Sequence, residues 1–278
     1  MNEQNTMQST RSGDMQILTG SALQGKNWVF NSWPLYQKNW PMWIILSLIY
    51  NFISIALTSM TFSVAISFIF QMGFIAGIYL SCKKTEAGEK LEIQTVFSAF
   101  NTNTKEIIFL GLIVFAMLFF VFCMSIAPII FVGGISLVKL MFSNPQAQNS
   151  QELFASLGGD LIVAIILAIL IFSIGFIFVI GAMIYAPILV VFEKLSISEA
   201  QGLSLKANFK NVLSMSSALF WLLLISLPVM IFTFGFGFIL LTPLYWGVLY
   251  LSYKDIFLIR SNTSPLSQPQ SPPEAEVL

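Results

Sequence analysis

The chain has 278 residues, of which 56% are hydrophobic and only 9% charged. Water-soluble domains typically have about half apolar and about a quarter charged residues, so this composition excludes an ordinary soluble domain. Its 13 basic residues balance 13 acidic ones, so no charge bias points to nucleic acid. With no histidine, and with Cys82 and Cys123 as its only cysteines, the chain has no set of residues for a structural zinc site or a disulfide framework, and we expect no metal or cofactor.

The two ends of the chain are polar. Residues 1–20 lack the short apolar core and small-residue cleavage site of a signal peptide, and we expect them to form a flexible cytoplasmic segment. Residues 259–278 are rich in Pro and Ser, and this composition predicts a disordered cytoplasmic tail. The membrane domain extends between them, over residues 21–258.

Charge-free runs define the expected spans. A helix needs about 20 apolar residues to cross the bilayer core, because its backbone amides must pair within the segment. The uncharged runs between Lys38 and Lys83 and between Lys210 and Lys254 are twice that length, and each indicates a helical hairpin. The sequence predicts an all-α bundle of six spans, at about 42–60, 62–82, 107–130, 161–190, 212–232 and 236–257.

The connection between the third and fourth spans is expected to be irregular. After Pro128 the chain continues through Gly133 and Gly134 to Lys139, which favours a short interfacial helix or a kinked extension of the span. Residues 143–158 are polar and include Asn144-Pro145, so we expect one sizeable extracytoplasmic loop there.

Positive charges give the expected orientation. Lys and Arg in short loops near span ends favour the cytoplasmic side. With six spans, 12 of the 13 Lys and Arg residues fall on one side and only Lys139 on the other. The pattern predicts that both termini lie in the cytoplasm.

A short amphipathic helix is expected before each odd-numbered span, at residues 23–33, 91–100 and 197–209. The second and sixth spans also end alike, with Tyr79-Leu80-Ser81 and Tyr250-Leu251-Ser252. This layout favours a threefold repeat of one surface helix and two spans, related by an axis normal to the membrane. The alternative is that these residues are ordinary interfacial anchors.

The middle of each predicted span contains no Asp, Glu, Lys or Arg, which argues against an ion-coupled transporter and an intramembrane acid–base enzyme. Asn51 and Gln71 are the largest polar side chains there, and serines accompany both at helical spacing. Such stripes favour hydrogen bonds between helices. The alternative is a weakly polar pocket at Asn51 and Gln71 for a lipid headgroup or an uncharged amphiphile.

Several short motifs carry a resemblance to a known family. They include Gly25-x-x-Trp28, Lys38-Asn39-Trp40-Pro41-x-Trp43, Gly88-Glu89-x-Leu91, Ala186-Pro187-Ile188 and Tyr250-x-x-Tyr253-x-Asp255. Over most of residues 20–258 the chain resembles an uncharacterised family of six-span bacterial inner-membrane proteins. The resemblance implies a place in the bacterial inner (cytoplasmic) membrane, and it brings no catalytic residues with it.

Two functional hypotheses follow. The first is a non-enzymatic scaffold or regulator that contacts a lipid or another membrane protein through its cytoplasmic amphipathic helices, because interfacial helices bury one apolar face. The candidate interaction surface comprises Trp28, Phe30, Trp33, Val96, Phe97, Phe100, Leu203 and Phe209. The second is a transporter or channel for an uncharged or lipid-like substrate near Asn51 and Gln71. An enzyme is disfavoured by the missing histidines and the uncharged spans.

Overall fold

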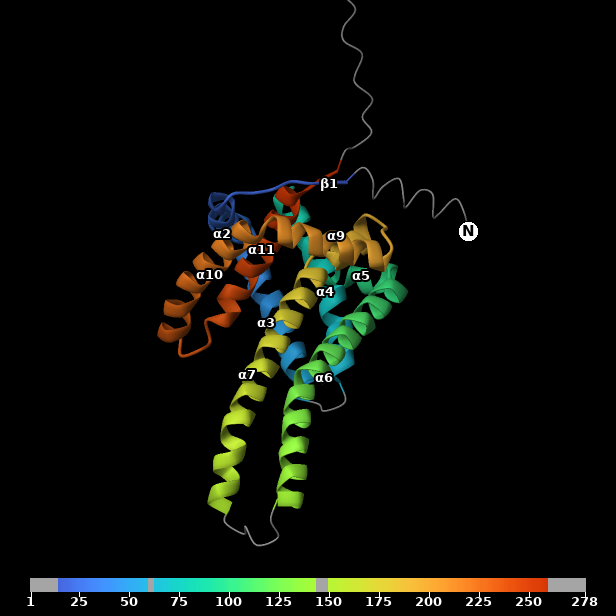
Figure 1. Cartoon of the computed structure of the whole chain (residues 1–278). Helices are drawn as coiled ribbons and strands as arrows, with labels where there is room; N and C mark the ends of the chain where they lie inside the picture. Colours follow the sequence, from blue (N-terminus) through green and yellow to red (C-terminus); the bar gives the residue numbers. More distant parts are fainter. Residues whose placement is uncertain (1–14, 60–62, 144–149, 260–278) are drawn as a thin grey trace, which may run out of the picture.

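The computed structural model describes residues 15–59, 63–143 and 150–259. Helices make up almost all of these residues, and one short β pair joins the two ends of the described chain (Figure 1). The predicted all-α fold is confirmed. Most of the predicted N-terminal segment and tail, at residues 1–14 and 260–278, lies outside the described residues.

Five of the described helices are long and apolar enough to cross a membrane. They are α3 (Trp40–Thr58), α4 (Val64–Glu86), α6 (Thr104–Ser143), α7 (Ser150–Met183) and α10 (Val212–Phe232). The apolar stretch of α7 continues into the short helix α8 (Ala186–Phe192). The outward faces of these helices carry many exposed Phe, Ile and Leu side chains. Such apolar faces are stable in contact with lipid and costly to expose to water, so the chain has the surface of a multi-pass membrane protein.

A further long helix, α11 (Phe238–Ile256), is not among these five, since its tyrosines and Lys254 lower its mean hydropathy. About half of its residues are buried, and it packs against α2, α3 and α4. Tyr250 and Tyr253 are both buried. The composition of α11 therefore reflects protein neighbours rather than direct contact with lipid.

Three shorter helices lie towards one end of the molecule, near the β pair (Figure 1). They are α2 (Ala22–Gln37), α5 (Ile93–Thr102) and α9 (Ile197–Lys210), close to the three amphipathic segments expected from the sequence. Capping boxes at Ser21 and Ser196 begin α2 and α9, because each serine and the Gln or Glu three residues later satisfy free amide groups of the first turn.

The hairpin of α6 and α7 differs from the prediction. The sequence favours a short interfacial helix or a kinked extension of the span after Pro128, and a loop over residues 143–158. The helix α6 extends through Pro128 to Ser143, as the second alternative expects, but α7 already begins at Ser150, inside the expected loop. Proline is tolerated in a membrane helix because neighbouring groups can satisfy the backbone carbonyl that it frees. The polar residues from Ser150 onward lengthen α7, and the hairpin projects past the other helices in Figure 1.

The N-terminal segment also differs from the prediction. Residues 1–20 were expected to be flexible, but β1 (Met15–Ile17) pairs antiparallel with β2 (Phe257–Ile259), so that Met15 lies opposite Ile259, the first residue of the predicted tail. Asn211 then holds the following residues, accepting from the Gly20 amide at 2.7 Å and donating to the Leu18 carbonyl at 2.9 Å. These backbone contacts fix residues 15–20 against α9 and α10.

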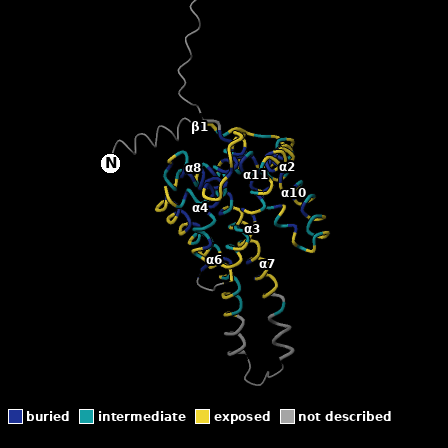
Figure 2. Tube along the Cα trace, turned by 180° about the vertical axis from the view of Figure 1, so that it is seen from behind, coloured by how far each residue is buried: buried dark blue, intermediate teal, exposed yellow. Residues whose placement is uncertain are grey.

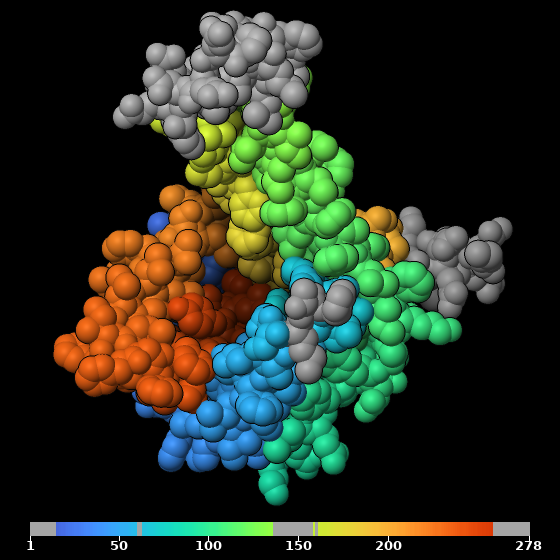
Figure 3. Space-filling model, turned by 90° about the horizontal axis from the view of Figure 1, so that it is seen from below, coloured from blue at the N-terminus to red at the C-terminus, as the bar shows by residue number. Residues whose placement is uncertain are grey.

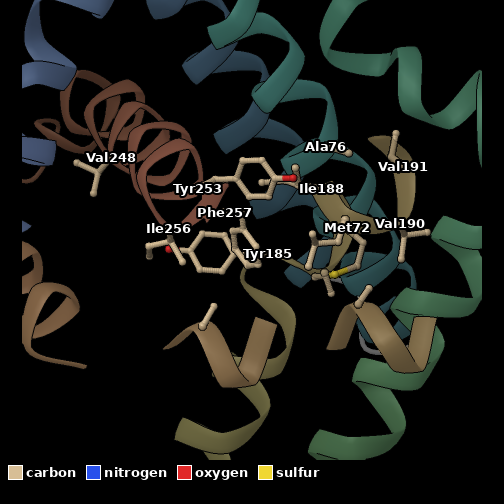
Figure 4. Close-up of a cluster of buried hydrophobic side chains, with 14 of the residues drawn as sticks. Met72, Ala76, Tyr185, Ile188, Val190, Val191, Val248, Tyr253, Ile256 and Phe257 are labelled. Carbon is tan, nitrogen blue, oxygen red and sulfur yellow. The ribbon is translucent and has the colours of Figure 1, made fainter. Parts of the chain in front are cut away.

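The core lies at the end of the molecule that carries the short helices, where the buried segments gather in Figure 2. Figure 4 shows part of it, with Met72 and Ala76 of α4, Ile188 of α8, and Tyr185 and Tyr253 close together. Towards the other end the helices separate and their side chains are more exposed. A bilayer offers apolar contacts to such surfaces, so a membrane protein does not need a protein core there.

Candidate functional site

The polar residue Asn51 is used for helix packing. Its side-chain Nδ2 donates to the Ser47 carbonyl at 2.8 Å and approaches Thr242 Oγ1 of α11 at 3.3 Å. Gln71 is half-buried on α4, and none of the hydrogen bonds within the described residues joins it to Asn51. The contacts of Asn51 therefore match the hydrogen-bonding alternative, and no hydrogen bond in the described part of the chain supports one polar pocket at Asn51 and Gln71.

The acidic residues at the end with the short helices are also paired. Glu86 forms an ion pair with Lys254 at 2.6 Å and accepts from the Tyr250 hydroxyl. The Tyr253 hydroxyl donates to Glu193 at 3.2 Å. These contacts connect α4, α8 and α11, and they give the carboxylates a role in holding helices together. Within the described residues, no group of three His, Cys, Asp or Glu side chains is placed to hold a metal ion.

Two apolar grooves lie where a short helix meets the long ones. The first, called here the α2 groove, has a volume of about 350 Å³. It is lined by Val29, Phe30, Trp33 and Tyr36 of α2, Ile225 and Val229 of α10, and Leu240, Leu241 and Leu244 of α11. Burial raises the pKa of the Tyr36 hydroxyl above its ordinary value, so this group stays neutral beside its apolar neighbours.

The second groove, called here the α9 groove, is larger, at about 470 Å³. Its walls are Phe176, Ile177, Ile180, Gly181 and Ile184 from the α7 side, Leu205, Asn208 and Phe209 of α9, and Val212, Met215, Ser216 and Leu219 of α10. The amide of Asn208 donates to the Gly181 and Ser204 carbonyls, both at 2.9 Å. The groove therefore presents an almost wholly apolar lining, and both volumes fall in the range of small-molecule sites.

The predicted interaction surface divides into two groups. Phe30 and Trp33 are about half exposed and line the α2 groove, while Phe209 is exposed and lines the α9 groove. The three residues Phe97, Phe100 and Leu203 are half-buried.

Trp28 and Val96 do not belong to an exposed surface, because both are buried. Trp28 is on α2 and faces α11, where its indole Nε1 donates to Asp255 Oδ2 at 2.7 Å. Val96 lies against α4, where Gly77 allows the backbone of α5 to come close. Amphipathic spacing identifies an apolar face, but it does not say whether lipid or another helix covers that face.

Other residues of the grooves could not be selected from the sequence. Ile177 and Val212 lie on helices in which apolar residues predominate on all sides, so local sequence does not distinguish them from other apolar residues of the same helices. Only the helix arrangement separates those that face a groove from those that face open bilayer.

The long helices form three hairpins with different seams between them. At the α4–α6 seam a Cβ on Gly111 would lie only 2.6 Å from the Ile69 Cα, and Phe68 packs on Phe115. At the α3–α11 seam Trp43 and Trp246 lie with ring centroids 6.0 Å apart. Helices therefore pack directly across both seams, although Phe68 and Phe115 also line an apolar pocket of about 280 Å³ between α4, α6 and α7.

The described residues of α7 and α10 do not pack closely. Tyr185 lies just after the C-terminal end of α7, and its hydroxyl is 3.9 Å from the sulfur of Met215 near the N-terminal end of α10. Further along the two helices, the α9 groove separates them. Figure 3, seen from below, shows a hollow between α7, α10 and the α3–α4 hairpin, with α11 at its floor. The α7–α10 seam is therefore open.

Comparisons with known proteins give no match: no protein-family model, no curated protein and no solved structure matches this chain.

Proposed function

We propose that the chain is a six-span protein of the bacterial inner membrane, with both termini in the cytoplasm and with α11 as the sixth crossing. At 1.5 Å per residue, the 19 residues of α11 extend about 28 Å, close to the thickness of a bilayer core. Six crossings also leave 12 of the 13 Lys and Arg residues on one side, as the positive-inside rule favours. The membrane's identity rests on the family resemblance.

A phosphatase that is active only outside the cytoplasm tests this topology. A fusion within residues 144–149 is expected to be active, and a fusion after residue 259 is expected to be inactive. An active fusion after residue 259 would contradict an even number of crossings.

The threefold repeat is supported by how the short helices dock. Each packs on the second long helix of the preceding unit, α5 on α4, α9 on α7 and, closing the circle, α2 on α11. At each docking point a residue of the short helix contacts a glycine. Val96 and Ser32 lie so close to Gly77 and Gly247 that a Cβ would not fit, whereas Ser204 donates a 2.8 Å hydrogen bond to the Gly181 carbonyl.

The three docking residues share one register. Each lies seven residues before an asparagine at the junction to the next long helix. These junctions have similar backbone angles, with φ −140° and ψ 40° at Asn39, φ −135° and ψ 40° at Asn103, and φ −111° and ψ 23° at Asn211. A similar turn after an identical spacing supports three equivalent units and is not expected of unrelated interfacial anchors.

The function that the geometry supports best is lipid binding without catalysis. The observation that carries it is the pair of apolar grooves formed by α2 and α9 with the long helices. In a bilayer, the abundant ligand for an apolar groove is an acyl chain, and buried CH₂ groups contribute about 0.8 kcal/mol each. The acidic residues Glu86, Glu193 and Asp255 meanwhile pair with other side chains of the chain.

A second function, transport of a lipid-like substrate, is favoured by the open α7–α10 seam and by the hollow in Figure 3. In this second function the substrate would bind at the open seam and not at Asn51, whose side chain is hydrogen-bonded to Ser47 and Thr242.

Mass spectrometry of phospholipid retained by the purified protein tests lipid binding. We expect the wild type to retain phospholipid, and Leu240→Trp, which fills the α2 groove, to retain less. Leu227→Trp is the matched control, because Leu227 is an exposed leucine of α10 outside the grooves. A wild type without retained lipid, or equal retention by the two variants, would contradict lipid binding in the α2 groove.

A further inference from the structure

The three hairpin seams are equivalent by position but not by packing. The second long helix of each unit faces the first of the next, as α4 faces α6, α11 faces α3 and α7 faces α10. Helices pack directly across the first two seams through the Gly111 contact and the Trp43–Trp246 pair, with an apolar pocket of about 280 Å³ beside the first of these seams. At the third, an apolar groove of about 470 Å³ takes the place of direct packing.

The depth of the α9 groove matches one leaflet of the bilayer. Along α10 its lining extends from Val212 to Leu219, which is about 10 Å at 1.5 Å per residue. A bilayer core is about 30 Å thick, so each leaflet contributes about 15 Å. The groove begins at α9, on the side with the positive charges, and therefore lies within the cytoplasmic leaflet of the proposed topology.

Two cations lie on α9, the helix that forms the cytoplasmic wall of this groove in the proposed topology. Lys206 and Lys210 are exposed on α9, next to the lining residues Leu205 and Phe209. The sequence between Glu199 and Asp255 contains no acidic residue, and Glu199 itself accepts a hydrogen bond from Ser196 at the start of α9. In the proposed topology these two lysines therefore place positive charge at headgroup depth on α9, where it complements a negative charge.

We propose that the α7–α10 seam is a lateral binding site for one anionic phospholipid of the cytoplasmic leaflet. Its acyl chain occupies the α9 groove, and its phosphate lies at Lys206 and Lys210. The proposal rests on the proposed lipid-binding function and adds the lipid class and the site.

A phospholipid fits this seam better than a second copy of the chain. A symmetric contact between two copies at this face would bring Lys206 and Lys210 of both copies together, and like charges at short range repel. A lipid instead supplies both an apolar chain for Ile177 and Val212 and a negative group for the lysines.

The test uses the full-length protein, freed of lipid by detergent exchange and titrated with phosphatidylglycerol or phosphatidylcholine under native mass spectrometry. The wild type is expected to prefer phosphatidylglycerol. Lys206→Gln with Lys210→Gln should reduce that preference by about fivefold for each lysine. The matched control is Lys83→Gln with Lys90→Gln, since these exposed lysines lie on other segments and should leave the preference unchanged.

A second pair of variants tests the groove itself. Val212→Trp fills the α9 groove and should reduce binding of both lipids at this site, whereas Leu213→Trp should not. The two residues are adjacent on α10 and similarly exposed, at 60% and 62%, and only Val212 lines the groove. Neither substitution alters the core, so a folded protein is expected in both cases.

The outcomes separate this inference from the proposed function. If the wild type binds both lipids equally, or if the double lysine variant keeps the preference, the anionic site is overturned while lipid binding stands. If Val212→Trp and Leu213→Trp bind alike, the α9 groove is not the site. If the wild type binds neither lipid, both the anionic site and the lipid-binding function are wrong.

Discussion

The indole Nε1 of Trp28 donates a 2.7 Å hydrogen bond to Oδ2 of Asp255, across 227 positions of sequence. This contact ties α2, the first helix of the described chain, to the last turn of α11. Together with the Ser32–Gly247 approach, it holds α2 against α11. Its consequence is that Trp28 stabilises the fold and is not available to a lipid or a partner.

Trp28→Phe is expected to lower the free energy of unfolding by about 1–3 kcal/mol, because the variant loses a hydrogen bond to a charged group. The fluorescence-monitored thermal unfolding of the purified protein measures this loss. Trp33→Phe is the control, since Trp33 is half exposed at the α2 groove and should change stability little. Equal shifts in the two variants would contradict the structural role of Trp28.

Gly77→Ala tests the docking of α5 on α4. A Cβ at residue 77 would clash with the Val96 carbonyl, and overpacking of this kind costs about 1–3 kcal/mol of stability. Gly133→Ala is the matched control, because a Cβ there meets nothing within 4 Å. Detergent unfolding curves of the two variants should differ clearly.

Gly247→Ala tests whether α2 docks on α11 in the same way. Its Cβ would lie 2.6 Å from that of Ser32, so a loss of stability similar to that of Gly77→Ala is expected. If Gly247→Ala unfolds like the wild type while Gly77→Ala is destabilised, the two docking points are not equivalent, and the threefold repeat fails.

Asn51→Leu and Gln71→Leu separate packing from binding. Asn51 donates to Ser47 and approaches Thr242, and such bonds contribute about 0.6 kcal/mol on average inside membranes. We expect Asn51→Leu to lower thermal stability measurably and Gln71→Leu to leave it unchanged. Unchanged stability in Asn51→Leu would contradict the packing role of Asn51 and favour the polar pocket.

The Glu86–Lys254 ion pair should contribute little. Its two side chains are 43% and 41% exposed, and exposed ion pairs typically stabilise by about 0–1 kcal/mol. A double-mutant cycle of Glu86→Gln and Lys254→Gln should give a coupling energy below about 1 kcal/mol, falling as salt is added. A larger, salt-independent coupling would show that the pair is screened from water.

Particular elements show where sequence reasoning succeeds. The predicted span at 212–232 coincides with α10, Val212–Phe232, because a charge-free run ends at polar or turn-forming residues on both sides. Part of the expected loop at 143–158 is helix, because the residues from Ser150 onward join α7, while residues 144–149 lie outside the described residues. Residues 15–20 are ordered by long-range partners in β2 and at Asn211, which no local pattern contains.

The sequence by itself determined the all-α class, the ranges of most long helices, and the gathering of positive charges around the three short ones. These properties are local, since backbone pairing and hydropathy act within single segments. The tertiary structure alone decided that Trp28 and Val96 are buried, that α2 docks on α11, and that a groove separates α7 from α10. Within a bilayer, lipid tails and apolar helices offer similar contacts, so hydrophobicity does not choose neighbours, and close fit at residues such as Gly77 and Gly247 does.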